Sequence, residues 1–131
     1  MIEVPKSFMD VSYESSRIPG VENQADLTLG ANCQVYIYAL LNHFGKNIPN
    51  FRSSELWDDI VFTKKVSDFH ALDIMMYNDS VNAYGAHVGL YLGDQRVVHL
   101  SKDNGIPKVE LHDELIKQRK YSVFIGAKRI L

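Results

Sequence analysis

The spacing of hydrophobic positions changes once along the chain. In residues 33–44, apolar side chains recur at every third or fourth position, which predicts one face of a helix, and Gly45 follows as a stop signal. Residues 86–100, AHVGLYLGDQRVVHL, are rich in β-branched and aromatic residues around a central Gly-Asp pair, which is typical of a β-hairpin. The pattern therefore predicts a helix that precedes a set of strands.

The other segments extend this order. Ser53, Ser54 and Glu55 indicate a short capped helical turn, and residues 71–77 form an apolar run that predicts a buried strand. KVEL and YSVFIGAKRIL predict two more strands around a short HDELIKQ helix, while the first thirty residues are loop-like. A helix followed by an antiparallel sheet of about four to six strands is an α+β fold. With no repeat, linker or low-complexity tract, residues 1–131 are expected to form a single domain.

Composition and charge narrow the possible functions. The 131 residues are 46% hydrophobic and 23% charged, with a net charge of −2 and no basic stripe, so nucleic acid is not expected as a partner. No apolar run is long enough to span a bilayer, and the N-terminus lacks the pattern of a signal peptide. As written, the chain is expected to be cytoplasmic or exported by a leaderless route. A mature chain stripped of its leader remains an alternative.

The chain has a single cysteine, Cys33, at the predicted start of the helix. Unpaired backbone N–H groups and the helix dipole favour a thiolate at this position, so we expect the pKa of Cys33 to lie below that of a free thiol. The alternative is a small buried side chain with no chemical role. A partner residue is needed to decide between the two.

Two histidines, His87 and His99, lie twelve residues apart in the two predicted arms of the hairpin. Side chains on one face of a strand pair share parity, so pairing His87 with His99 requires an odd loop, and residues 92–94 could form a three-residue connection. A two-residue turn at residues 94 and 95 would separate the two side chains unless a bulge intervenes. On one face, one imidazole could contact the thiol while the other orients it, as in covalent catalysis.

At these residues the sequence resembles the NlpC-type cell-wall cysteine peptidases, a papain-like group that cleaves peptidoglycan stem peptides. GANCQVYIYALLNHFG is similar to the opening of the family's catalytic helix, LDIMMYN to its Gly-Asp-Leu strand, and AHVGLYLGDQRVVHLSK to its His-Val-Gly hairpin. The resemblance spans residues 28–105 and implies a papain-like NlpC-type fold. It makes Cys33 the nucleophile, His87 the base and His99 the orienting residue, with Asp73 structural.

The sequence departs from the family pattern around the cysteine. Asn32 and Gln34 replace the family's flanking Asp and Ser, and its Tyr-x-Trp-Gly-Gly segment is not recognisable in PGVENQADLTLG. The backbone N–H of Cys33 is expected to donate to an oxyanion, because it points out of the first helical turn. The candidate side-chain donors are Tyr13, Asn23 and Gln24.

The resemblance implies a cysteine peptidase or amidase that hydrolyses amide bonds, with a peptide or murein-derived substrate and no metal or cofactor. A catalytically inactive binding module on the same fold, or a thiol acyltransferase, are the alternatives. A zinc site formed by Cys33, His87 and His99 is disfavoured, because these residues lack the closely spaced pairs of structural zinc sites. The sequence does not indicate an oligomeric state.

Overall fold

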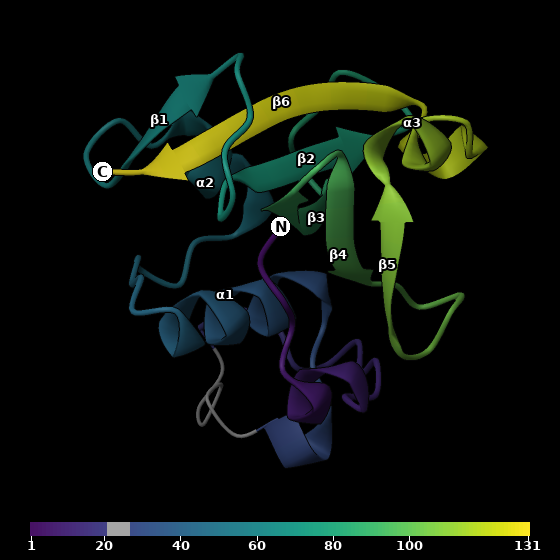
Figure 1. Ribbon diagram of the computed structural model, residues 1–131. Coiled ribbons are helices and arrows are strands. Elements are labelled where there is room, and N and C mark those ends of the chain that lie inside the picture. The colour runs from purple at the N-terminus through teal and green to yellow at the C-terminus, as the bar shows by residue number, and fades with distance from the viewer. Residues whose placement is uncertain (21–26) are drawn as a thin grey trace.

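The computed structural model describes residues 1–20 and 27–131, and its elements follow the predicted order of a helix before a sheet (Figure 1). The helical elements are η1 (Lys6–Met9), η2 (Leu27–Leu29), α1 (Cys33–His43), α2 (Ser53–Asp58), α3 (His112–Leu115) and η3 (Arg119–Tyr121). The strands are β1 (Thr63–Val66), β2 (Ile74–Asn78), β3 (His87–Gly93), β4 (Arg96–Leu100), β5 (Pro107–Leu111) and β6 (Val123–Ile130). The predicted α+β class is confirmed.

The strands form one six-stranded antiparallel sheet in the order β1-β6-β2-β3-β4-β5. The strand count lies at the upper end of the predicted range because β1 was not predicted. In β1 only Thr63 is buried, and its neighbours Lys64 and Lys65 are exposed at the sheet edge. An edge strand of this kind carries no alternation of apolar and polar residues, so the sequence gives no signal for it.

Helix α1 packs against β3 and β4 on one face of the sheet (Figure 1). The side chain of Asn32 caps the helix by accepting a hydrogen bond of 2.9 Å from the backbone N–H of Val35. The core on this face is formed by apolar side chains of α1, β2, β3 and β4: Val35, Ile37, Leu40, Leu41, Ile74, Met76, Val88, Leu90, Val98 and Leu100. This core fixes the position of the N-terminus of α1 relative to β3.

A second, smaller core covers the opposite face of the sheet. It contains Met75, Tyr77, Tyr91, Val97, Leu115, Tyr121 and Ala127, so α3 and η3 supply its outer side. Successive side chains of a strand point to opposite faces, so His87 shares this face with Tyr91, and His99 shares it with Val97. The two histidines therefore lie on the face away from the body of α1.

The turn of the β3–β4 hairpin differs from the favoured prediction. Asp94 and Gln95 form a two-residue turn, both with positive φ (54° and 64°), and the register shifts between Tyr91 and Gly93. The three-residue loop of residues 92–94 is therefore wrong, and the alternative with a bulge is correct. The extra residue restores the parity, so His99 lies opposite Gly89 and diagonal to His87 on the same face.

Strand β2 begins at Ile74, three residues later than predicted, because the chain turns at Leu72, which has a φ of 77°. Asp73 is buried at this point and accepts hydrogen bonds from Arg129 Nε and an Arg129 terminal nitrogen at 2.9 and 2.8 Å. Such a bidentate pair joins the start of β2 to the end of β6. Asp73 is thus a structural residue in this fold.

Candidate active site

Cys33 is the first residue of α1 and is half-buried. Its position follows from the cap at Asn32, which starts the helix there, and from the packing of α1 against β3. Cys33 opens onto a cavity of about 230 Å³, which is lined by Tyr13, Cys33, Gly85, Ala86, His87, Ser101, Lys102, Asp103, Lys120 and Tyr121. A larger cavity of about 500 Å³ beside η1 and η2 is lined by none of the three predicted site residues.

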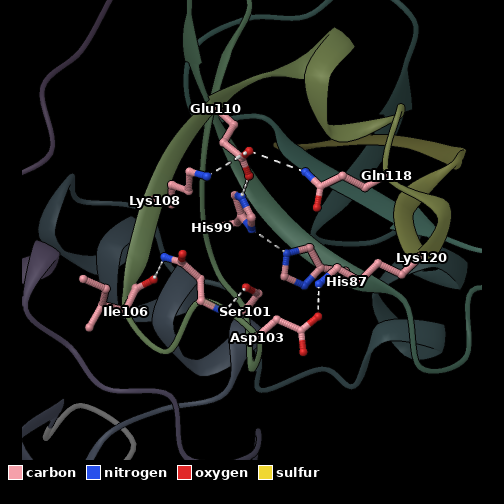
Figure 2. A network of polar contacts seen from close by, with 10 residues as sticks. His87, His99, Ser101, Asp103, Ile106, Lys108, Glu110, Gln118 and Lys120 are labelled. Atoms are coloured by element: carbon pink, nitrogen blue, oxygen red, sulfur yellow. Dashed lines mark hydrogen bonds and ion pairs between the residues drawn. The ribbon is translucent and has the colours of Figure 1, made fainter.

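The two histidines of the hairpin contact each other directly (Figure 2). His87 Nε2 and His99 Nδ1 are 2.9 Å apart, and the two rings are nearly perpendicular, with an interplanar angle of 89°. The diagonal contact crosses Gly89, where the absence of a side chain leaves room for both rings. The structure thus brings His87 and His99 together, and places His87 in the same cavity as Cys33.

The sequence did not identify Glu110, which continues this line of contacts. Its Oε2 lies 2.6 Å from His99 Nε2, and the side chains of His99 and Glu110 are only 3% and 15% exposed. Glu110 belongs to β5, where Lys108 is directly opposite His99, so Glu110 reaches His99 diagonally on the same face. Finding it required the register between β4 and β5, which KVEL alone does not reveal.

Tyr121 of η3 was also not predicted as a site residue. Its ring stacks on the His87 imidazole with the centroids 4.4 Å apart and an interplanar angle of 19°. This stacking restricts rotation of the His87 ring within the cavity. At the cavity rim, Lys120 forms an ion pair with Asp103 and so connects η3 to the β4–β5 loop (Figure 2).

The electrostatics of Cys33 correct one expectation. Burial raises the pKa of the Cys33 thiol, although backbone hydrogen bonds from Val88, Gln34 and Cys33 itself oppose this effect. The expected low pKa of a thiol at a helix start is therefore wrong. Desolvation of the sulfur outweighs the effect of the helix terminus, because the cavity is narrow and α1 is packed against the sheet at this end.

Burial also lowers the pKa of both histidines, since it disfavours their charged forms. For His87, the neighbouring His99 and Lys120 lower the pKa further. For His99, the hydrogen bond and charge of Glu110 act in the opposite direction. In the resting protein, Cys33 and His87 are therefore a neutral thiol and a neutral imidazole.

Of the three candidate oxyanion donors, Tyr13 lies in the cavity beside Cys33. A parallel bridge between Tyr13 and Ala31 holds it two residues before the cysteine, and burial and the nearby Cys33 raise its pKa. The phenol therefore stays protonated and able to donate. Asn23 and Gln24 lie outside the described residues.

Two features of the described part of the chain concern other classes of site. Within residues 1–20 and 27–131, no group of three or more His, Cys, Asp or Glu side chains has the arrangement needed to hold a metal ion. In the same two ranges, every helix is too short or too polar to cross a bilayer.

Comparison with known proteins supports the same fold. RipB, a peptidoglycan hydrolase from Mycobacterium tuberculosis, matches 95% of this chain at 22% identity and a TM-score of 0.61, with 60% of its own chain covered. The NlpC/P60 domain of the peptidoglycan hydrolase SagA matches 82% of this chain at 17% identity and a TM-score of 0.57, with 83% covered. An NlpC/P60 protein from Bacillus cereus matches 78% at 17% identity and a TM-score of 0.58, but this chain spans only 32% of its length.

No curated protein sequence is significantly similar to the chain. The profile of the NlpC/P60 family, however, matches residues 19–125, which contain Cys33, His87, His99 and Glu110. The match covers most of the sequence and agrees with the sheet order and the site geometry. This chain therefore belongs to the NlpC/P60 family.

Proposed function

We propose that this chain is a cysteine hydrolase that cleaves amide bonds in peptidoglycan stem peptides. Cys33 is the nucleophile, His87 is the base, and His99 orients His87. The observation that carries the proposal is the 2.9 Å contact between His87 Nε2 and His99 Nδ1 at a cavity shared with Cys33. The substrate class is supported by family membership and by RipB and SagA, which are peptidoglycan hydrolases.

The first half of the reaction forms an acyl-enzyme. His87 Nδ1 accepts the proton of the Cys33 thiol as the sulfur attacks the carbonyl carbon of the scissile amide. The resulting imidazolium then donates this proton to the leaving amine, and the C–N bond breaks to give a thioester on Cys33. Because the resting pair is neutral, the proton moves during the attack, and His87 acts as a general base.

The tetrahedral intermediate requires donors for its oxyanion. The backbone N–H of Cys33 belongs to the first turn of α1, where it has no partner within the helix. The phenol of Tyr13, which lines the same cavity, supplies the second donor in this proposal. It would take the place of the tyrosine in the family segment that this sequence lacks.

The second half releases the product. A water molecule gives a proton to His87 Nδ1 and attacks the thioester carbonyl, and the proton returns to the Cys33 sulfur as the C–S bond breaks. The products are a carboxylic acid and an amine, and the thiol and neutral imidazole are restored. No atom or electron is needed beyond substrate and water.

The experiment that tests this function is incubation of the purified chain with soluble muropeptides, followed by mass spectrometry. We expect products whose combined mass exceeds that of the substrate by one water, and no products with Cys33→Ser. The matched control is Ser101→Ala, which changes a hydroxyl in the same cavity but not the nucleophile. If the protein binds muropeptides without cleaving any of them, the inactive binding module is the correct interpretation.

A further inference from the structure

Both ring nitrogens of His99 are engaged in short contacts inside the fold. Nδ1 is 2.9 Å from His87 Nε2, and Nε2 is 2.6 Å from Glu110 Oε2 (Figure 2). His99 is almost fully buried, so the hydrogens on these nitrogens are determined by the protein rather than by solvent. The chemistry of the two partners therefore sets which nitrogen carries the proton.

The direction of each hydrogen bond follows from Glu110. An ionised carboxylate can only accept, so the proton of neutral His99 lies on Nε2 and is donated to Glu110. His99 Nδ1 then has a lone pair and accepts from His87 Nε2–H. Neutral His87 has one ring proton, and with that proton on Nε2, its Nδ1 is left free to accept the proton of the Cys33 thiol.

The reverse arrangement would disable the base. If His99 carried its proton on Nδ1, it would donate to His87 Nε2, and His87 would carry its own proton on Nδ1. A protonated Nδ1 cannot accept the proton of Cys33. The 2.9 Å contact between the rings fits both arrangements equally well, so another group must select between them.

Glu110 is held in the ionised state that makes this selection. Burial opposes ionisation, but the hydrogen bond and charge of His99, together with Lys108, lower its pKa. Its second oxygen, Oε1, contacts Lys108 Nζ and Gln118 Nε2, both at 3.4 Å. The other charged side chain acting on His99 is Lys120, so cations and one amide surround the carboxylate.

We propose that Glu110 is a positioning residue that fixes the tautomer of His99 and, through it, the tautomer of His87. The consequence for catalysis rests on the proposed function, because it assumes that His87 serves Cys33. The tautomers themselves do not depend on that assumption. The site is thus a line of four side chains, in which Glu110 never touches the substrate.

The direct test is ¹⁵N NMR of protein labelled at histidine, which distinguishes protonated from unprotonated ring nitrogens. In the native protein at neutral pH, we expect His87 and His99 to be Nε2–H tautomers. In Glu110→Gln, which keeps the shape but removes the charge, we expect both residues to populate the Nδ1–H form. The matched control is Glu114→Gln, an exposed glutamate paired with Lys117, which should leave both tautomers unchanged.

A second readout uses the rate at which iodoacetamide alkylates Cys33 at pH 7. We expect Glu110→Gln to lower this rate about 10-fold, a typical effect of removing a group that orients a reactive residue. In the His87→Ala background, Glu110→Gln should cause no further loss, because Glu110 acts only through His87. An equal further loss in that background would overturn the proposal.

The two hypotheses fail in different ways. Nδ1–H tautomers in the native protein, or tautomers that Glu110→Gln leaves unchanged, would overturn the role of Glu110 even if Cys33 is a nucleophile. A Cys33 that never reacts, in a protein with the expected tautomers, would overturn the proposed function and leave the role of Glu110 intact. The thermal unfolding of each variant shows that a change in rate does not reflect a lost fold.

Discussion

His99 and His112 are both buried histidines on the same side of the sheet, and both use Nδ1 in a hydrogen bond. His112 Nδ1 lies 2.8 Å from the hydroxyl of Tyr77, and burial lowers its pKa as it does for His99. The partners differ, however. His99 lies between a second imidazole and a carboxylate, whereas the ring of His112 packs against the aromatic rings of Phe69 and Phe124.

The comparison shows that burial alone does not make a histidine functional. His112 is neutral, is hydrogen-bonded to a phenol and adds an aromatic ring to the smaller core. His99 is equally buried, but Glu110 makes its two nitrogens unequal and so gives the contact with His87 a direction. A charged partner at the second nitrogen distinguishes a relay from a packing residue.

The strongest break in this comparison removes the residue through which His99 acts on the thiol. We expect His87→Ala to lower the rate of alkylation of Cys33 by iodoacetamide at pH 7 about 100-fold, the lower range for loss of a general base. The native rate should rise with pH through the lowered pKa of His87, below its usual 6.5, and again when the thiol itself ionises.

In His87→Ala only the second, alkaline rise should remain. The rate measured from pH 5 to pH 10 in both proteins checks this expectation. His43→Ala is the control, because His43 lies at the far end of α1 from Cys33. Identical profiles for the native protein and His87→Ala would mean that Cys33 and His87 do not act as a pair.

The second prediction reverses the roles of the two buried histidines. We expect His112→Ala to lower the free energy of unfolding by about 2 kcal/mol, because it removes a buried ring and leaves the Tyr77 hydroxyl without its partner. The alkylation rate of Cys33 should not change. Chemical denaturation and the alkylation assay at pH 7 measure the two effects, and a rate that falls with the stability would place His112 in the relay.

A third prediction concerns the gap between the two arms of the relay. A side chain at Gly89 would place its Cβ 2.6 Å from Val97 Cγ1 and 3.5 Å from His99 Cβ. We expect Gly89→Ala to destabilise the fold by about 1–3 kcal/mol through overpacking and to slow alkylation by displacing His99. The control is Gly105→Ala, where the added Cβ meets no neighbour but the φ of 78° strains the backbone.

Gly105→Ala should therefore lower stability without changing the rate. Unfolding curves and alkylation rates of the two variants, compared at the same temperature, provide the measurement. A Gly89→Ala protein with native reactivity would show that the relay does not depend on the space between the rings.

The smallest expected effect is the pH dependence of stability. The pKa of His87, His99 and His112 is lower in the fold than the ordinary 6.5, so the unfolded chain binds more protons below that pH. Stability should therefore be complete above pH 6.5 and fall as the pH decreases below it. We expect a melting temperature a few degrees lower at pH 5 than at pH 7, with a smaller difference in His112→Phe.

The sequence predicted those parts of the fold that follow from local patterns. The helix from Cys33 required only its apolar spacing and the glycine after it, and the hairpin required only alternation around a turn. The shared face of His87 and His99 was also predictable, because parity is a property of strands. The loop was not, since a two-residue turn with a bulge and a three-residue loop give the same parity.

The parts that the sequence missed depend on contacts between distant segments. Glu110 and Tyr121 join the site only through the pairing of β5 with β4 and the position of η3 beside β3, which no local pattern encodes. The pKa of Cys33 was wrong for the same reason. The helix start is visible in the sequence, but the burial that outweighs it results from tertiary packing.

The bulge between Tyr91 and Gly93 constrains how the length of this hairpin can change during evolution. Surface turns usually tolerate insertions and deletions, but here the loss of one residue would rotate β4 by one position relative to β3. Val98 would then face the cavity, and His99 would point into the apolar layer beneath α1. Length variants of this turn are therefore expected to differ by two residues, a pattern that an alignment of related sequences can reveal.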